Sequence, residues 1–175
     1  NKNDAFSKNS QYREFENYLI KIDNLIEKEN DSALIYIKKA RLLAEKTNYK
    51  LGEVKILEAK GSFQLSVKSD YENAQKTLLL SIKKCETYKI NYLAYLYHSL
   101  GRVFHMSDNY KKAKNYYLIS YEYAIKEKDT AAIVLSLSSL GTINYRENNF
   151  EAAEKFFNKS LKYPSTNATK NVIFS

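Results

Sequence analysis

The chain has 175 residues, of which 44% are apolar, and a formal net charge of +8, so it is long enough for one domain with a hydrophobic core. One proline and four glycines favour long helices over a turn-rich β fold. The single Cys85 excludes an intrachain disulfide, and no apolar run reaches the roughly 18 residues of a membrane span.

Pairs of helices are predicted along the chain from apolar residues that recur at spacings of three and four. The first helices of the pairs are expected at 12–28, 51–68, 91–106 and 130–147, and their partners at 31–46, 71–87, 110–127 and 150–163. A small residue recurs in the second helices at Ala33, Ala74, Ala113 and Ala153. This period of about 40 residues predicts a helical repeat protein.

Two Leu-Gly dipeptides, Leu100-Gly101 and Leu140-Gly141, lie at equivalent positions of two successive predicted first helices. Each glycine is followed at the same spacing by the alanine of the partner helix, and one helical turn later by an aromatic residue, Tyr117 or Phe157. Glycine inside a helix costs about 1 kcal/mol relative to alanine. We therefore expect a second helix to cross close to each glycine, where a larger side chain would not fit.

Polar turns separate the two helices of each later pair, at Ser69-Asp70, Ser107-Asp108-Asn109 and Asn148-Asn149. These residue types are preferred N-caps. Ser69 and Glu72 also have the spacing of a capping box, and Pro164 is expected to end the last complete helix.

These residues resemble the tetratricopeptide repeat (TPR). The third pair reads Tyr97, Leu100-Gly101, Phe104, Ala113, Tyr117, Ser120, and the fourth reads Leu137, Leu140-Gly141, Asn144, Ala153, Phe157, Ser160. The second pair has Gly61-Ser62 in place of Leu-Gly, and the first has Lys21 at the glycine position. The resemblance implies an all-α, right-handed α-solenoid of four antiparallel helical hairpins, about 12–46, 51–87, 91–127 and 130–163. The repeat period of about 40 residues in this chain is similar to that of a long TPR variant found in bacterial sensory and regulatory proteins.

The predicted organisation is an N-terminal flank at 1–11, a single solenoid at 12–163, and a segment at 164–175. The last segment is either a tail or the start of a truncated next repeat. By the forty-residue count, the next first helix should start there, so we expect the entrance to a fifth repeat or a capping helix.

In the TPR family the first helices line a concave groove that binds ligands. The resemblance implies that the groove residues here are Phe63, Tyr95, His98, Arg102, His105, Ser138, Thr142 and Tyr145, with Arg146 beside them. Arginine pairs with carboxylates, aromatic rings stack, and hydroxyls bond backbone groups, so this set suits a peptide. An ordinary solvated inner face is the competing interpretation.

The sequence gives little support for a carboxylate clamp, a metal or cofactor site, or an enzyme active site. The lysine and asparagine residues of the TPR carboxylate clamp are absent, because His98 and Arg102, then Ser138 and Thr142, take their positions. His98 and His105 lie two helical turns apart, too far for a shared metal ion, and no metal or other cofactor is expected. No nucleophile-base pair or phosphate-binding glycine loop is present, so we expect no enzyme activity.

The predicted function is a non-enzymatic protein- or peptide-binding TPR scaffold, as the sensory or interaction region of a larger bacterial regulatory protein. One alternative is an assembly scaffold that forms homo-oligomers through its solenoid ends. Another is a helical repeat that binds nucleic acid, although the positive charge is almost wholly lysine, which is a weak signal for specific recognition. The compartment stays open: cytoplasmic, or periplasmic if Asn1 follows a removed signal or anchor segment.

Overall fold

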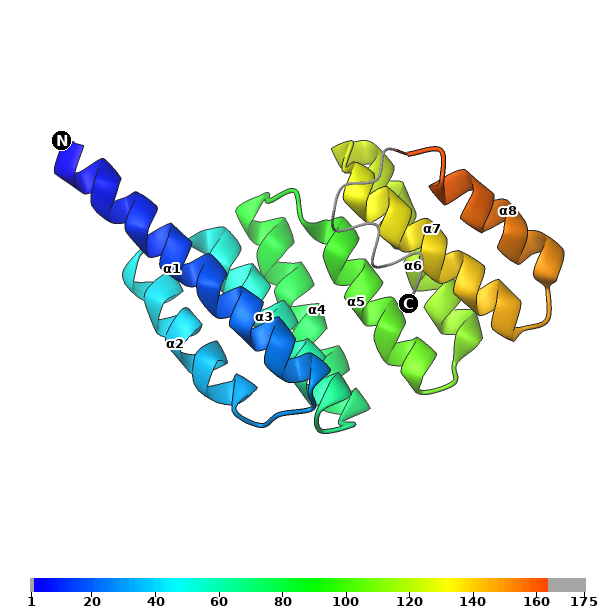
Figure 1. The fold of residues 1–175 in the computed structure, drawn as a ribbon, viewed down its shortest axis with the longest axis horizontal. Coiled ribbons are helices and arrows are strands. Elements are labelled where there is room, and N and C mark those ends of the chain that lie inside the picture. The colour runs from blue at the N-terminus through cyan, green and yellow to red at the C-terminus, as the bar shows by residue number, and fades with distance from the viewer. Residues whose placement is uncertain (1, 164–175) are drawn as a thin grey trace. The chain divides into compact units, whose positions relative to one another are not determined.

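A computed structural model describes the backbone of residues 2–163 and the side chains of residues 9–163. Within these residues the fold consists of eight α-helices and no strand (Figure 1). Neighbouring helices form antiparallel hairpins, and none of these helices is long and apolar enough to cross a membrane. The helices are α1 (Lys2–Glu27), α2 (Ala33–Lys46), α3 (Lys50–Ser66), α4 (Tyr71–Tyr88), α5 (Leu93–Met106), α6 (Tyr110–Glu127), α7 (Thr130–Arg146) and α8 (Phe150–Ser160).

The prediction of an all-α fold of helical hairpins is confirmed, with one change at the start. The first helix was expected from residue 12, but α1 begins at Lys2 and takes in most of the predicted flank. The last helix was expected to reach residue 163 and to end at Pro164, but α8 ends at Ser160. Pro164 itself and the interpretation of 164–175 lie outside the described residues. The chain forms two compact units, Asn1–Ile90 and Asn91–Ser175.

The first unit contains α1 to α4. Its core lies where α1 packs on α2 and α3, and it is built from Phe15, Ile22 and Ile26 of α1 with Ile37 of α2 and Phe63 of α3. The α1 side chains recur at a spacing that places them on one side of the helix. Small alanines of α2 fill the remaining space, which allows the helices to approach closely.

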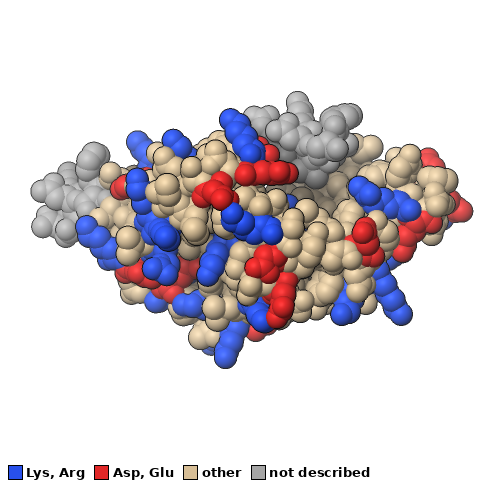
Figure 2. Space-filling view, turned by 90° about the horizontal axis from the view of Figure 1, so that it is seen from below, with Lys and Arg blue, Asp and Glu red and all other residues tan. Residues whose placement is uncertain are grey.

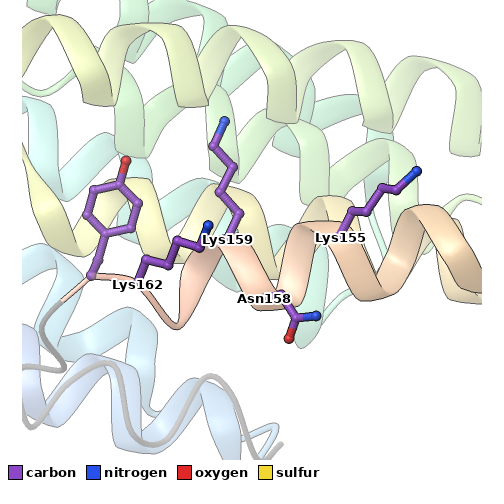
Figure 3. A pocket seen from close by; sticks show the side chains of 5 residues that line it. Lys155, Asn158, Lys159 and Lys162 are labelled. Atoms are coloured by element: carbon purple, nitrogen blue, oxygen red, sulfur yellow. The ribbon is translucent and has the colours of Figure 1, made fainter.

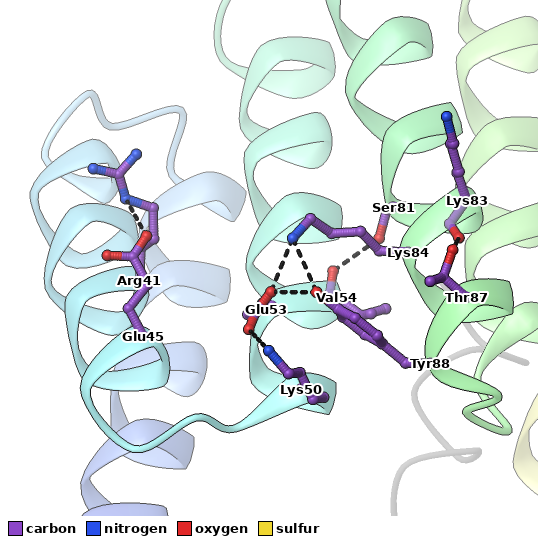
Figure 4. Close-up of polar contacts among 10 residues, drawn as sticks. All are labelled: Arg41, Glu45, Lys50, Glu53, Val54, Ser81, Lys83, Lys84, Thr87 and Tyr88. Carbon is purple, nitrogen blue, oxygen red and sulfur yellow. Dashed lines mark hydrogen bonds and ion pairs between the residues drawn. The ribbon is translucent and has the colours of Figure 1, made fainter.

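A polar network joins α3 to α4 in this unit (Figure 4). Glu53 of α3 accepts hydrogen bonds from Lys50 Nζ and Lys84 Nζ, both at 2.9 Å, and from the Tyr88 hydroxyl at 2.8 Å. Burial works against the charge of Glu53, but these donors outweigh it and lower the pKa of the carboxyl to about 2. The buried Ser81 hydroxyl adds a 2.9 Å bond to the Val54 carbonyl.

The second unit contains α5 to α8, and buried hydroxyl groups connect three of its helices. Ser120 of α6 donates to the Ala94 carbonyl of α5 at 2.7 Å and shares a 2.8 Å bond with Ser136 of α7. All of these groups are buried, so each bond replaces water that the fold has excluded. The bonds hold α5, α6 and α7 in one register.

Close approach at the helix glycines is confirmed. A Cβ added to Gly101 would lie 2.6 Å from the Tyr117 ring, and one added to Gly141 would lie 2.5 Å from the Phe157 ring. The same relation occurs in the first unit, where Gly61 faces Leu78. Each hairpin from the second onward therefore brings a glycine of its first helix against a large residue of its second helix.

The turns inside these hairpins share one geometry. The N-caps are Asp70, Asn109 and Asn149, and each side chain accepts a hydrogen bond from the backbone N–H three residues ahead. The residue before each cap has a positive φ, between 50° and 60°. The predicted capping box at Ser69 is therefore wrong, because Ser69 takes this left-handed position and Asp70 is the cap.

Candidate functional site

The predicted groove residues of the second unit lie on α5 and α7, which pack against each other. From here on, the α5–α7 face means the set Tyr95, His98, Arg102, His105, Ser138, Thr142, Tyr145 and Arg146. These residues differ widely in exposure. His98 and Ser138 are buried, Arg102 and His105 are half-buried, and Tyr145 is 61% exposed.

A chain of polar contacts runs beneath this face. His98 Nε2 and Ser139 Oγ share a hydrogen bond of 2.9 Å between α5 and α7. The Tyr117 ring from α6 lies 5.1 Å from the His98 ring, and its hydroxyl is 3.4 Å from His105 Nδ1. Tyr117 therefore contacts both histidines and restricts the positions of their imidazole rings.

Burial decides the charge of these groups. It lowers the pKa of His98 to about 3, with the charges of Arg102 and His105 acting in the same direction. It also raises the pKa of Tyr117 to about 12. His98 is consequently neutral at physiological pH and bonded inside the protein, so this predicted groove residue exposes little surface to a ligand.

Three basic residues are called the cationic corner: Arg102 and His105, three positions apart on α5, and Arg146, the last residue of α7. Burial lowers the pKa of His105, and the charges of Arg146 and Arg102 lower it further, against the opposite effect of Asp108. Both guanidinium groups therefore act electrostatically on the same imidazole, one from α5 and one from α7. His105 is also in edge contact with the Tyr110 ring, 5.8 Å between centroids.

An exposed aromatic pair lies at the adjoining turn between α7 and α8. Tyr145 and Phe150 are 61% and 56% exposed, and their rings meet edge to face at 5.3 Å. Exposed aromatic rings offer apolar contact at a low entropic cost because they have few rotatable bonds. Together with the cationic corner, they give this end of the unit both charge and apolar surface.

The hydroxyl groups of the face are less available than the sequence implied. Thr142 Oγ1 donates to the Ser138 carbonyl within α7, and the Tyr95 hydroxyl donates to Asp129 at 3.2 Å. Ser138 Oγ is buried and has no hydrogen-bond partner among the described residues. Of the three, only Ser138 keeps an unused donor.

Phe63 does not belong to this face. It is 5% exposed and packs in the core of the first unit. The reason is a difference in sequence separation between the two residues that meet in each hairpin. Gly61 and Leu78 are one position further apart in the sequence than Gly101 and Tyr117. Aligning the repeats on Ala74 therefore put Ser62, and not Gly61, at the glycine position. Every predicted groove position of α3 was moved by one residue as a result.

A separate open pocket lies along α8 and the residues that follow it (Figure 3). It is lined by Lys155, Asn158, Lys159, Lys162 and Tyr163. Two of the lysines already have partners, since Lys155 pairs with Glu151 at 2.6 Å and Lys159 lies 4.7 Å from the centre of the Tyr121 ring. Sequence reasoning did not single out this pocket, although the lysine spacing of four and three was visible.

Comparison with known proteins matches residues 92–163 to the tetratricopeptide repeat family model. These residues are tetratricopeptide repeats. The match covers α5 to α8, so the TPR resemblance is confirmed where the Leu-Gly dipeptides occur. None of the curated proteins compared with the chain matches it.

One similar solved structure is a signal transduction ATPase with numerous domains (STAND) protein with a tetratricopeptide repeat sensor, from Pyrococcus horikoshii. The identity is 19% and the TM-score 0.64, and the match covers 94% of this chain. It covers 25% of the other chain, so the present chain spans about a quarter of that protein's length. At this identity the likeness shows the fold alone.

Proposed function

We propose that this TPR chain is a non-catalytic scaffold that binds a protein or peptide segment on the α5–α7 face of its second unit. The observation that carries the proposal is the cationic corner beside the exposed Tyr145–Phe150 pair. Arginine and aromatic residues are the types most often responsible for binding energy at protein interfaces. TPR repeats as a class present such side chains on a rigid helical frame.

We further propose that the scaffold is the sensory or interaction region of a larger regulatory protein. The STAND protein with a TPR sensor supports this, since the present chain matches about a quarter of it. Ligand binding would then act on a region outside the chain by shifting the population of its conformations.

Binding to nucleic acid has less support. Basic and acidic side chains are interspersed on the face seen in Figure 2, where a phosphate backbone would favour a continuous basic surface. The eight ion pairs among the described residues also occupy several of the lysines.

The test is selection from a random peptide library displayed on phage, followed by affinity measurement with the enriched peptides. We expect the double variant Arg102→Gln/Tyr145→Ala to bind them at least tenfold more weakly than the wild type. The matched control, Arg41→Gln/Tyr71→Ala, changes an exposed arginine and tyrosine of the first unit and should bind normally. Equal binding by both variants would move the site away from the α5–α7 face.

A further inference from the structure

The open pocket along α8 has three lysines and no acidic residue among the described residues that line it. This set is defined here as the α8 pocket: Lys155, Asn158, Lys159, Lys162 and Tyr163. Lys155 and Lys159 are about one helical turn apart in α8. The Lys162 N–H bonds to the Lys159 carbonyl at 3.3 Å, so the chain makes one more tight turn after the helix. The three lysine side chains extend from the same side of the ribbon (Figure 3).

Among the described residues, two of these ammonium groups have no carboxylate partner, since neither Lys159 nor Lys162 forms an ion pair there. Lys159 Nζ lies 4.7 Å from the centre of the Tyr121 ring of α6. A cation–π contact of this kind holds an ammonium group in place without cancelling its charge. The N–H groups of Lys159 that point away from the ring can therefore donate to an anion.

The third ammonium group has a partner that a ligand can replace. Lys155 pairs with Glu151, one turn earlier in α8, at 2.6 Å. Both side chains are largely exposed, by 73% and 80%. An exposed ion pair contributes little to stability, because water solvates the separated charges well. Exchanging Glu151 for a carboxylate of a ligand therefore costs little, and the pocket offers three positions for anionic groups.

We propose that the α8 pocket binds an acidic helical segment of a partner protein, with a carboxylate of that segment against each lysine. This site goes beyond the proposed function, since none of its residues belongs to the α5–α7 face. The lysines follow one another by four and three positions, the spacing at which residues share one side of a helix. A partner helix with Glu or Asp at the same spacing presents its carboxylates at matching intervals.

The fixed aromatic wall of the pocket also suits a peptide. Tyr163 is half-buried and packs against the core cluster of the second unit, as does Tyr121 beneath Lys159. Neither ring has to be ordered when a ligand binds, so little conformational entropy is lost there. The aliphatic part of a glutamate side chain can pack on Tyr163 while its carboxylate reaches a lysine.

The charge pattern of α8 favours an acidic segment over a nucleic acid. Glu151 and Glu154 are exposed on α8 directly before the lysines, so the positive charge is confined to the end of the helix and the turn after it. A nucleic acid carries a phosphate at every nucleotide, and its backbone would pass these carboxylates. A peptide can carry its carboxylates only where the lysines lie.

The experiment measures the binding of labelled probes to the whole chain by fluorescence anisotropy at low ionic strength. The first probe is an alanine-based helical peptide with three glutamates spaced by four and three positions. The second has the same glutamates moved to different sides of the helix, so its length, composition and charge are identical. The third probe is a thymidine oligonucleotide, which tests whether any polyanion binds.

We expect the first peptide to bind on the order of tenfold more tightly than the second, because only the matched spacing allows three exposed ion pairs to form together. The triple variant Lys155→Gln/Lys159→Gln/Lys162→Gln should lose this preference. Lys162→Glu leaves the cation–π contact of Lys159 in place, and it should weaken binding of the first peptide more than binding of the second.

The matched control is Lys38→Gln/Lys76→Gln/Lys83→Gln, which removes the same charge from exposed lysines of the first unit. Lys76 pairs with Glu72 in an exposed i,i+4 pair, as Lys155 does with Glu151, and the control should keep the preference for the first peptide. Equal binding of the two peptides by the wild type, or an equal loss in both triple variants, would overturn the proposal. Tighter binding of the oligonucleotide than of the first peptide would overturn it as well.

Discussion

The two units of this chain differ in the polar contacts that join their helices and turns. In the first unit, ion pairs join helices at Glu53–Lys84 and Glu16–Lys55, and a third, Asp31–Lys68, joins the turns that follow α1 and α3. In the second unit, buried hydroxyls of Ser120 and Ser136 join helices, and a histidine–serine bond joins α5 to α7. The difference is one of degree, because the first unit also has the buried Ser81–Val54 bond and the second unit also has the Lys114–Glu147 ion pair.

This difference bears on where a ligand can bind. A charge that already has an internal partner gains little from a ligand, because the existing pair must first be broken. Arg102 and Arg146 have no such partner among the described residues. Both arginines of the second unit therefore remain available to pair with a ligand.

The largest expected effect is the loss of stability when a helix glycine is substituted, and it should differ between the two units. Gly101→Leu should lower the free energy of unfolding by about 3 kcal/mol, because its Cβ would meet the rigid Tyr117 ring at 2.6 Å in a buried helix crossing. Gly61→Ala should cost less than about 1 kcal/mol, since its neighbour Leu78 is flexible and alanine favours the helix. Denaturant unfolding followed by circular dichroism measures both. Wild-type stability in Gly101→Leu would contradict the hairpin register.

A second prediction is that the two units lose stability over different pH ranges. The pKa of His98 is about 3 in the fold, below its ordinary value of 6.5, so the unfolded chain takes up this proton more readily. Stability is therefore lost as the pH falls below 6.5, by about 1.4 kcal/mol per unit, or about 2 kcal/mol between pH 7 and pH 5. Glu53 in the first unit has a pKa of about 2, below its ordinary 4.5, so its contribution is kept above pH 4.5 and lost toward pH 2.

Amide hydrogen exchange at pH 7 and pH 5, corrected for intrinsic rates, measures the two units separately. Protection should fall in α5 and α7 while α3 and α4 change little. In the control variant His98→Gln the decrease between the two pH values should become clearly smaller, and what remains is due to His105, whose pKa burial also lowers. A loss of protection that is the same in both units, or that persists in His98→Gln, would show that His98 is not its cause.

Much of this fold could be predicted from local pattern. The glycine–aromatic spacing at Gly101 and Gly141 predicted close helix crossings, since only a packing contact explains glycine twice at one phase of a helix. The helices of the second unit begin within two residues of the predicted starts. The spacing of apolar residues and the identity of the turn residues suffice to predict these helices, because the contacts within a hairpin are local in sequence.

The candidate site was less predictable because it depends on exposure and on contacts between helices. His98 and Phe63 were assigned to the groove from helical phase, yet a shift of register by a single position puts Phe63 in the core, and Ser139 and Tyr117 enclose His98. Spacing along one helix says which residues share a side but not what packs over them. The pairing of Glu147 with Lys114, which leaves Arg146 unpaired, likewise involves α6 and could not be read from α7.

The smallest expected effect tests a feature that both units share. Asn109 caps α6 by accepting the Lys112 N–H, as Asp70 caps α4, and removing such a cap typically costs about 1 kcal/mol. Asn109→Ala should therefore lower the free energy of unfolding by about that amount, and Asp70→Ala should act in the same direction. Ser69→Ala should change it much less, because Ser69 precedes the cap in a left-handed conformation. If Ser69→Ala instead costs as much as Asn109→Ala, the capping box expected from Ser69 and Glu72 is present in solution, and the first unit begins its second hairpin helix differently from the second unit.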